Sequence, residues 1–359
     1  MSRKPLAIVG AGMSGLSLAV ALRRLGRRVD VYEAAAEPPR SRTFCGFEVE
    51  DHPFTSAVGH RWNDVVVRGP GETHRRPLVR HPYAMIEGSA FVDRALGLLE
   101  GTDVRLHFGA PVADVADLAD AAHVFDSRPA PPAPDALLQV FAGRFVRTAE
   151  PRFDPGAATL MDFRVDQSRG VHFVYVLPTS RTEALVEDTY FVPGPLAPEV
   201  FAETLDAQLA ALGDHEVLAT EAGTIPMSTA EPPPAPPGVT RIGLAGGVAK
   251  ASTGYAFLFA QRHAQAIRVA LREGRPPPAT VRSAQQVFLD QVFLERLRAE
   301  PTAGHRLFLR MFERTSGDRL ARFLSETASL RDTLAIMRSL PLGPFAWQAV
   351  RTGLVPRRP

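Results

Sequence analysis

The first 33 residues hold the pattern that most limits what this chain can fold into. Leu6–Val9 is a short apolar run, as expected for a buried parallel strand. It leads into the glycine turn of residues 10–15, a helical pattern that ends near Gly26, and a second strand that is followed by Glu33. This succession of strand, glycine turn, helix, strand and acid predicts a Rossmann-type unit that binds a dinucleotide.

Each residue type in this unit has a physical role. Gly10 permits the tight turn, Gly12 lets the backbone approach a pyrophosphate, and Gly15 lets the helix pack closely on the strand. The phosphates would lie against the free amides at the positive end of the helix. Glu33 would accept hydrogen bonds from a ribose hydroxyl. A tight turn without a ligand is the alternative, but the elements around the turn favour nucleotide binding.

The position of the unit favours FAD over NAD. A single unit of this kind at the N-terminus of a chain of 359 residues is typical of FAD-dependent folds. Residues 124–128 are predicted to form a strand that ends at Asp126, which matches the late strand of an FAD domain. An ordinary exit from a strand into a turn is the alternative at that point. We therefore expect an FAD site to which Asp126 contributes.

Composition excludes several classes of protein. With 41 basic and 39 acidic residues, the chain lacks the clustered basic excess of a nucleic-acid-binding protein. Its single cysteine, Cys45, forms no intramolecular disulfide, and the histidines lack metal-ligand spacing, so we expect no metal. No run of 18 apolar residues is present, so we expect a cytoplasmic protein whose membrane contact is peripheral at most. No protein partner is inferred.

Three segments in the middle of the chain have the alternation of strands. They are residues 159–165, 171–177 and 184–191, with a turn at residues 168–170 between the first two. Together they predict an antiparallel sheet that would form one wall of a substrate chamber.

Proline clusters divide the chain, because proline cannot donate a backbone hydrogen bond to a helix or a sheet. The clusters at residues 129–134, 232–237 and 276–278 are predicted to be joints between structural blocks. We expect a discontinuous FAD-binding domain of residues 1–70, 96–128 and 239–275, a substrate-binding domain of residues 71–95 and 129–238, and a helical C-terminal region of residues 276–359.

Several segments, in this order, resemble the bacterial lycopene cyclase family: QVFAGRFV, PRFDPGAATLMDFRV, FVYVLP, EALVEDTYF and GLAGGVAKASTGYAF. SRTFCGFEVE is similar to the family's Arg-Thr-Trp element, with Phe44 at the Trp position, and this similarity adds Arg42 and Thr43 to the cofactor residues. The resemblance covers residues 6–265 and implies an α/β fold of the hydroxylase-type flavoprotein architecture. A Rossmann-like FAD-binding domain, an antiparallel-sheet substrate domain and a helical C-terminal region would make up that fold.

The resemblance also implies a chemistry. An acid protonates the terminal double bond of a linear carotenoid, the cation closes to a β-type ring, and a proton is lost. The flavin is reduced, with NAD(P)H as its reductant, but it is not consumed. Glu187 matches the family's essential acid and Asp188 is its neighbour, which alternates to the opposite face of the strand. A buried carboxyl that keeps its proton is the form that such chemistry needs.

The glycine-rich segment after residue 242 is predicted to meet the flavin ring. Gly246, Gly247, Thr253, Gly254 and Tyr255 are the candidate cofactor residues there. We expect the next helix, capped by Ser252 or Thr253, to direct its positive end at the flavin. A glycine loop without a chemical role is the alternative. No Asp follows Gly243, which counts against an oxygenase of the hydroxylase type.

Residues 287–324 have apolar positions at helical spacing together with many arginines. The arginines are Arg296, Arg298, Arg306, Arg310, Arg314, Arg319 and Arg322. Basic amphipathic helices of this kind either contact the inner membrane surface, where a carotenoid would enter, or form a helical cap with arginines in solvent.

Three other functions stay open at this stage. A redox flavoenzyme, such as a reductase or epoxidase of a polyene or prenyl lipid, would share the FAD domain but consume NAD(P)H. A protein that only binds flavin or carotenoid would gain nothing from Glu187. The same cyclase chemistry on another terpenoid is the third.

Overall fold

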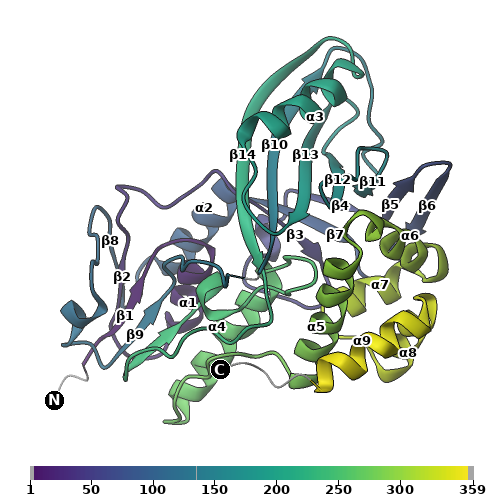
Figure 1. Cartoon of the computed structure of the whole chain (residues 1–359). Coiled ribbons are helices and arrows are strands. Elements are labelled where there is room, and N and C mark those ends of the chain that lie inside the picture. The colour runs from purple at the N-terminus through teal and green to yellow at the C-terminus, as the bar shows by residue number, and fades with distance from the viewer. Residues whose placement is uncertain (1–3, 135, 355–359) are drawn as a thin grey trace.

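The computed structural model describes residues 4–134 and 136–354, and the remaining positions of the predicted domain ranges lie outside the described residues. Figure 1 shows three parts. A parallel sheet with its helices lies beside the N-terminus, a tall sheet of long strands rises from the centre, and a group of helices holds the C-terminal residues.

The part nearest the N-terminus is a parallel five-stranded sheet with the order β15-β9-β1-β2-β8. Its strands are β1 (Leu6–Val9), β2 (Val29–Tyr32), β8 (Val104–His107), β9 (His123–Asp126) and β15 (Val239–Arg241). The helices α1 (Met13–Leu22), α2 (Gly88–Leu99) and α4 (Phe257–Arg272) contribute to the core on one face, and residues 112–121 cover the other. Because both faces are covered, all four residues of β1 are buried, as the sequence predicts.

The tall part is a seven-stranded sheet with the order β14-β10-β13-β12-β11-β5-β6. Its strands are β5 (Asp64–Gly69), β6 (Glu72–Pro77), β10 (Leu137–Thr148), β11 (Ala157–Asp162), β12 (Val171–Pro178), β13 (Glu183–Val192) and β14 (His215–Met227). Neighbours are antiparallel except for β5 and β11, which run parallel. The helix α3 (Pro198–Ala210) packs on one face of this sheet.

The three strands predicted from alternation are β11, β12 and β13, and the predicted antiparallel pairing is confirmed. The first strand ends at Asp162, three residues before its predicted end. The Asp162 carboxylate accepts hydrogen bonds from the backbone N–H of Arg164 at 3.1 Å and from its guanidinium at 2.8 Å. This local turn competes with continuation of the strand.

A third, small sheet has the order β3-β7-β4. Its strands are β3 (Thr43–Phe47), β4 (His60–Trp62) and β7 (Tyr83–Glu87). The predicted ranges 1–70 and 71–95 divide this region differently from the observed packing. β5 pairs within the seven-stranded sheet, whereas α2 packs on α1 in the core of the parallel sheet, because strand pairing joins segments that are distant in sequence.

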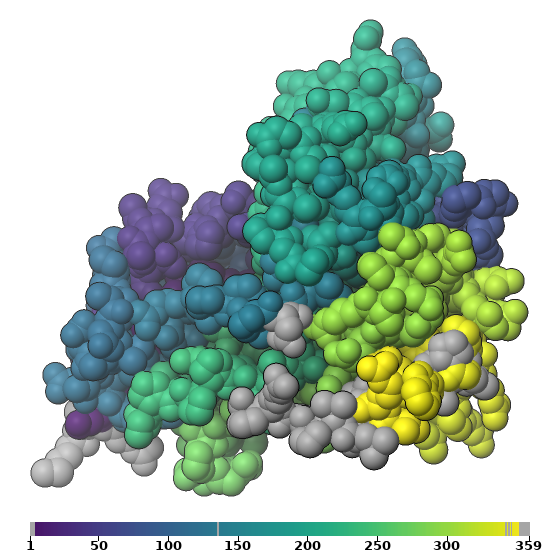
Figure 2. Space-filling view, in the orientation of Figure 1, coloured from purple at the N-terminus to yellow at the C-terminus, as the bar shows by residue number. Residues whose placement is uncertain are grey.

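The C-terminal region is helical, as predicted. It contains α5 (Ala284–Ala299), α6 (His305–Arg314), α7 (Gly317–Leu324), α8 (Leu330–Ser339) and α9 (Leu342–Leu354). Phe308 and Phe312 of α6 share one core with Val65 and Phe173 of the tall sheet. Figure 2 shows these helices, in yellow-green and yellow, packed against the lower end of that sheet. Within the described residues, no helix has the length and apolar character needed to cross a membrane.

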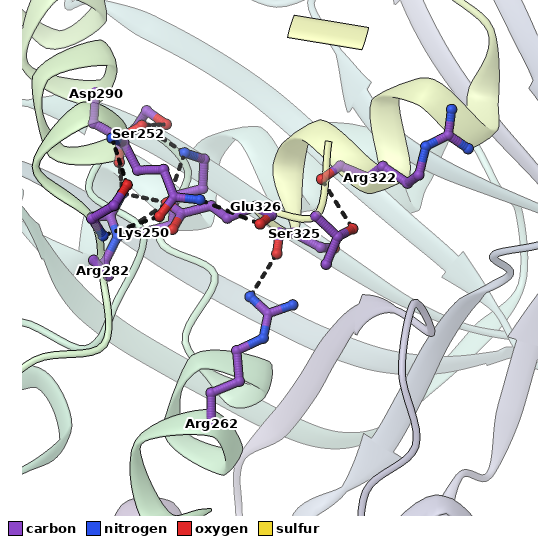
Figure 3. Close-up of polar contacts among 11 residues, drawn as sticks. Lys250, Ser252, Arg262, Arg282, Asp290, Arg322, Ser325 and Glu326 are labelled. Atoms are coloured by element: carbon purple, nitrogen blue, oxygen red, sulfur yellow. Dashed lines mark hydrogen bonds and ion pairs between the residues drawn. The ribbon is translucent and has the colours of Figure 1, made fainter. Parts of the chain in front are cut away.

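A buried ionic network joins the C-terminal helices to the segment that precedes α4 (Figure 3). Lys250 donates to Asp290 of α5 at 2.6 Å and to Glu326 at 3.3 Å. Arg282 binds the same two carboxylates, and Ser252 donates to Asp290 at 2.7 Å. The four charged side chains are 3–5% exposed. Two cations and two anions therefore balance inside the protein, which makes each depend on the others.

Replacing Lys250 by Met should leave two buried carboxylates with a single cation. We expect the free energy of unfolding to fall by about 3–5 kcal/mol, measured by denaturant titration at pH 7. The matched control is Arg275→Met, which removes a cation from an exposed pair with Glu273 and should cost less than about 1 kcal/mol. Equal losses in the two variants would contradict a coupling role for the network.

Candidate active site

A cavity of about 430 Å³ lies where the three sheets and the C-terminal helices meet. One end, here called the nucleotide end, is bounded by the glycine turn after β1 and by the N-terminal ends of α1 and α4. The other end, here called the chamber, lies on the inner face of the seven-stranded sheet and under α6. Its wall is mainly apolar and includes Leu160, Phe173, Leu185, Phe191, Phe308 and Phe312.

The glycine turn has the geometry that a pyrophosphate site requires. Gly10 has φ +94°, which favours glycine, and a Cβ on Gly15 would lie 1.9 Å from the carbonyl oxygen of Gly10. Gly12 precedes α1 without a side-chain cap, and a Cβ built on it would meet no atom within 4 Å. The first amides of α1 are therefore open toward the cavity, as anion binding at a helix start needs.

Of the two predicted acids, Glu33 lies at the turn, but neither Glu33 nor Asp126 lines the cavity. The Glu33 carboxylate accepts a hydrogen bond from the backbone N–H of Ala11 at 2.7 Å. Asp126 is bound by the guanidinium of Arg128 at 2.8 and 2.9 Å, because the arginine two residues later folds back onto it. From this segment, Ser127 lines the cavity instead.

Five of the predicted cofactor residues line the cavity beyond the glycine turn: Arg42, Thr43, Thr253, Gly254 and Tyr255. Arg42 and Thr43 come from the start of β3, and the other three from the segment that the ionic network anchors. Gln139 of β10 is a further wall residue that the sequence analysis missed. A polar residue inside a strand gives no separate sequence signal of a ligand.

The glycines of the segment before α4 are arranged differently from the prediction. Gly243 and Leu244 line the cavity, whereas Gly246 and Gly247 do not. A Cβ on Gly246 would lie 2.5 Å from the carbonyl oxygen of Arg241, so that glycine serves backbone packing. The predicted helix cap is wrong. α4 begins at Phe257 with Ala256 as its N-cap and no side-chain cap, because Ser252 and Thr253 lie in a turn before the cap position, where the Ser252 hydroxyl is bound to Asp290.

Two buried polar atoms in the cavity wall are unsatisfied by the described residues. They are Oε1 of Gln139 and Oγ1 of Thr253. A buried polar atom without a partner costs about 1–3 kcal/mol, so a bound group with matching donors and acceptors would stabilise this wall. Together with the glycine turn and the uncapped starts of α1 and α4, these residues suit a dinucleotide with a polar ring system.

Glu187 of β13 points into the chamber and is 9% exposed. Burial, and to a smaller extent the nearby Glu221 carboxylate, raise its pKa from 4.5 to about 8, against a hydrogen bond from Thr189 that lowers it. The Thr189 hydroxyl donates to Oε1 at 3.0 Å. Glu187 therefore keeps its proton at neutral pH, which is the form that an acid for an apolar substrate requires.

Glu221 of β14 is a second carboxyl in the chamber wall, which the sequence analysis missed. In the sheet register, Gly143 of β10 lies opposite both Glu187 and Glu221, and Tyr175 of β12 lies opposite Glu187. These four residues form a row across the sheet on one face. Burial raises the pKa of Glu221, whereas Thr43 and Arg42 lower it.

Asp188 lies on the opposite face of β13, as the predicted alternation requires, and it does not line the chamber. It is fully buried and its Oδ1 lies 2.6 Å from Nε2 of His172. Nδ1 of the same histidine donates to the carbonyl oxygen of Asp166 at 2.7 Å, and its ring stacks on Tyr190. The structure therefore does not bring Asp188 to Glu187's side of the sheet.

Three tyrosines stand beside the two glutamates. Tyr83 and Tyr175 share a hydrogen bond between their hydroxyls, and their rings meet edge to face. The ring of Tyr255 lies 6.3 Å from that of Tyr83. Burial raises the pKa of all three hydroxyls, so they stay neutral. The chamber thus combines neutral aromatic rings with a protonated carboxyl.

The fold is the architecture of hydroxylase-type flavoproteins. The fold is similar to a geranylgeranyl bacteriochlorophyll reductase-like protein from Thermoplasma acidophilum, with a TM-score of 0.63 over 96% of this chain and 98% of that one at 14% identity. It is also similar to Klebsiella pneumoniae HpxO, solved with FAD and uric acid, with a TM-score of 0.58 over 96% and 99% of the two chains at 16% identity. At such identities the likeness concerns the fold alone.

Residues 5–349 match the family described as lycopene cyclase protein, and the chain belongs to that family. It is 26% identical to the lycopene beta-cyclase of Pantoea ananas, over 97% of this chain and 98% of that protein. It is 27% identical to the lycopene beta-cyclase of a Paracoccus strain, over 98% and 97% of the two chains. The resemblance found from the sequence segments is thereby confirmed.

Glu187 should make the protein less stable as the pH rises. Its raised pKa means that the folded state keeps a proton that the unfolded state releases, so stability falls between pH 4.5 and about 8. We expect Glu187→Gln to remove this fall and to be more stable than the unmodified protein at pH 8, by up to about 4 kcal/mol. Denaturant titrations at several pH values measure it, with Glu183→Gln as control, at the half-buried start of β13 where Glu183 pairs with Arg147. Parallel pH curves for all three proteins would contradict the buried acid.

Proposed function

We propose that the protein cyclises the ψ-end groups of lycopene, or of a related linear polyene, to β-ionone-type rings without net redox change. The observation that carries this proposal is the buried, protonated Glu187 in an apolar chamber that adjoins a dinucleotide site. A hydrocarbon offers an enzyme no polar group, so its reaction must start at a double bond. A carboxyl held protonated beside apolar walls is the group that starts it.

The proton moves from Glu187 to the terminal double bond. Because the Thr189 hydroxyl donates to Oε1, the proton is carried on Oε2, and the same hydroxyl stabilises the carboxylate that remains. The resulting tertiary cation is attacked by a neighbouring double bond, which closes a six-membered ring. Loss of a ring proton then gives the β-type ring. Substrate and product are isomers, and no electrons are exchanged with the protein.

Aromatic walls protect the cation from water and stabilise it. A cation over an aromatic face gains about 0.5–2 kcal/mol, and more when water is excluded. Phe173, Tyr175 and Phe308 supply such faces in the chamber wall.

We infer that FAD occupies the nucleotide end, with its pyrophosphate at Gly12 and its ring system near Thr253 and Gly254. Reduced FAD, regenerated by NAD(P)H, would supply an electron-rich ring next to the chamber. Asp188 acts as a positioning residue in this scheme. Its pair with His172 fixes β13 from the far face, so that Glu187 stays in the chamber.

Turnover of liposomal lycopene by the protein with reduced FAD, under anaerobic conditions in heavy water, tests the proposal. We expect a cyclic isomer with one solvent deuterium per ring, read by mass spectrometry, and no net oxidation of the flavin. Glu187→Gln should lower the rate by at least about 10²-fold while flavin binding is retained.

Other results would assign the protein elsewhere. A product that differs from lycopene by two hydrogens or by oxygen, with NAD(P)H consumed in proportion, would make it a redox flavoenzyme. Cyclisation of another terpenoid but not of lycopene would keep the chemistry and change the substrate. Binding without any product would leave only a carrier of flavin or carotenoid.

We also propose that α8 and α9 rest on the cytoplasmic face of the inner membrane, where a carotenoid substrate is dissolved. Exposed apolar side chains follow one face of α8, at Leu330, Leu334 and Met337, and continue on α9 at Trp347 and Val350. Arg331, Arg338 and Arg351 are exposed beside them. An apolar face with basic flanks matches the interfacial region of an anionic bilayer.

Four of the arginines of α5–α7 contribute little to such a surface. Arg319 and Arg322 bind Asp332, Arg296 binds Glu300, and Arg310 donates to the carbonyl oxygen of Ser339. These charges are used within the protein, and α6 itself covers the chamber. In this proposal α5–α7 form the helical cap, and α8 and α9 form the membrane contact.

Tryptophan fluorescence tests the membrane surface directly, because the chain has two tryptophans and Trp62 is fully buried. We expect vesicles rich in anionic lipid to shift the emission of Trp347, which is 65% exposed, to shorter wavelength. Leu334→Asp combined with Met337→Asp should weaken binding by about tenfold or more. Val79→Asp, at another exposed apolar side chain, is the control. An unchanged affinity in the double variant would exclude this surface.

A further inference from the structure

We propose that Glu221 is the proton-sharing partner of Glu187: the two carboxyls hold one proton between them, and Glu221 exchanges it with solvent. The inference rests on the proposed cyclisation and adds to it a second acidic residue that sets when the first is charged.

Sheet register carries the inference. Gly143 of β10 lies opposite Glu187 of β13 on one side and opposite Glu221 of β14 on the other, so the two side chains project from the same face. A Cβ on Gly143 would lie 3.4 Å from Cβ of Glu187 and 3.4 Å from Cγ of Glu221. Because Gly143 has no side chain, the side chains of Glu187 and Glu221 flank the same position on this face, together with Cδ1 of Leu185 at 2.9 Å from that Cβ position.

Both members of the pair are buried, each 9% exposed, and both line the chamber. Ionising both carboxyls would place two negative charges near each other in an apolar site, which costs electrostatic free energy. The pair therefore retains one proton. The surroundings decide where it lies. Arg42 and Thr43 are next to Glu221 and favour its ionised form, whereas Glu187 has Thr189 alone as a polar partner. Glu187 is thus the acid and Glu221 the carboxylate.

Other titratable groups around the pair do not change charge in the relevant range. Tyr175, Tyr83 and Tyr255 from β12, β7 and the segment before α4, and Cys45 from β3, all have a pKa raised by burial. Asp188 on the far face of β13 adds a small repulsion to Glu187. Arg42 is the cation on the Glu221 side. The three tyrosines and Cys45 therefore stay neutral over the pH range in which the two glutamates exchange their proton.

Glu221 also connects the pair to solvent. It lines a second hollow, open on the outside of the sheet, together with Ser41, Arg42, Arg144 and Thr220. Glu187 lines the chamber but not this hollow, so a bound polyene would seal it from water. A proton can therefore reach Glu187 from the outer hollow through Glu221 while the substrate fills the chamber.

The proton balance closes over one cycle. The O–H bond of Glu187 breaks as a C–H bond forms at the terminal alkene carbon, which leaves both carboxyls ionised. Their repulsion makes the pair a strong base, so it accepts the proton that the ring carbon loses as the new double bond forms, and Glu221 exchanges the proton of the pair with the outer hollow. One proton leaves the pair and one returns, and no oxidant or reductant takes part.

The variant Glu221→Gln removes the charge but keeps the shape. Without the like charge, the pKa of Glu187 falls and its protonated fraction decreases at alkaline pH. We expect the alkaline limb of the kcat–pH profile to move to lower pH, so that kcat at pH 9 is about tenfold below that of the unmodified enzyme, with KM little changed. Gly143→Ala, which wedges a methyl group between the carboxyls, should shift the limb in the same direction. Glu216→Gln, at an exposed position of β14, is the control.

Infrared titration of the protonated carboxyl band gives a readout without turnover. The unmodified protein should retain a protonated carboxyl up to about pH 8, and Glu221→Gln should lose it at lower pH. An unshifted band and an unshifted alkaline limb in Glu221→Gln, with Glu187→Gln inactive, would show that Glu187 acts alone and would overturn the inference. If the unmodified protein makes no ring product, the proposed function fails, yet the infrared titration still decides whether the pair exists.

Discussion

The exclusion of water from one carboxyl is the constraint on which the rest of the structure depends. Glu187 keeps a proton near neutral pH mainly because the tall sheet and α6 bury it among apolar side chains. That burial requires the C-terminal helices to stay in place, and the ionic network around Lys250 and Asp290 joins them to the segment that lines the nucleotide end. Stability is given up at the chamber, where an acid is held away from water, and part of it is recovered in a balanced set of charges nearby.

The nucleotide half of the molecule could be predicted from sequence because its interactions are local. Residues 6–33 contain the strand, the glycine turn, the helix and the acid in succession, and the structure folds them as one unit. The exceptions are single side-chain contacts, one between neighbours and one between residues 38 positions apart. Asp126 is taken by Arg128, and Ser252 is taken by Asp290, and neither competition can be read from residue type.

The chamber could be predicted only in part, because it is assembled by strands that are far apart in the sequence. Glu187 was found through the resemblance of its strand to a family, and the alternation of β13 placed Asp188 on the other face. Glu221 carries no such signal, since a glutamate on a long edge strand is an ordinary solvent-facing residue until its partner is known. Only the register of β14 with Gly143 brings it next to Glu187.

That dependence on register explains why the acid site tolerates no slip in the sheet. A shift of β13 by one residue would turn Val186 or Asp188 toward the chamber and move Glu187 to the face under α3. The far-face contact of Asp188 with His172 opposes such a shift. The shift would place the Asp188 carboxylate among apolar side chains and separate it from His172. The pair on one face therefore positions Glu187 on the other: contacts that do not line the chamber orient the carboxyl that does.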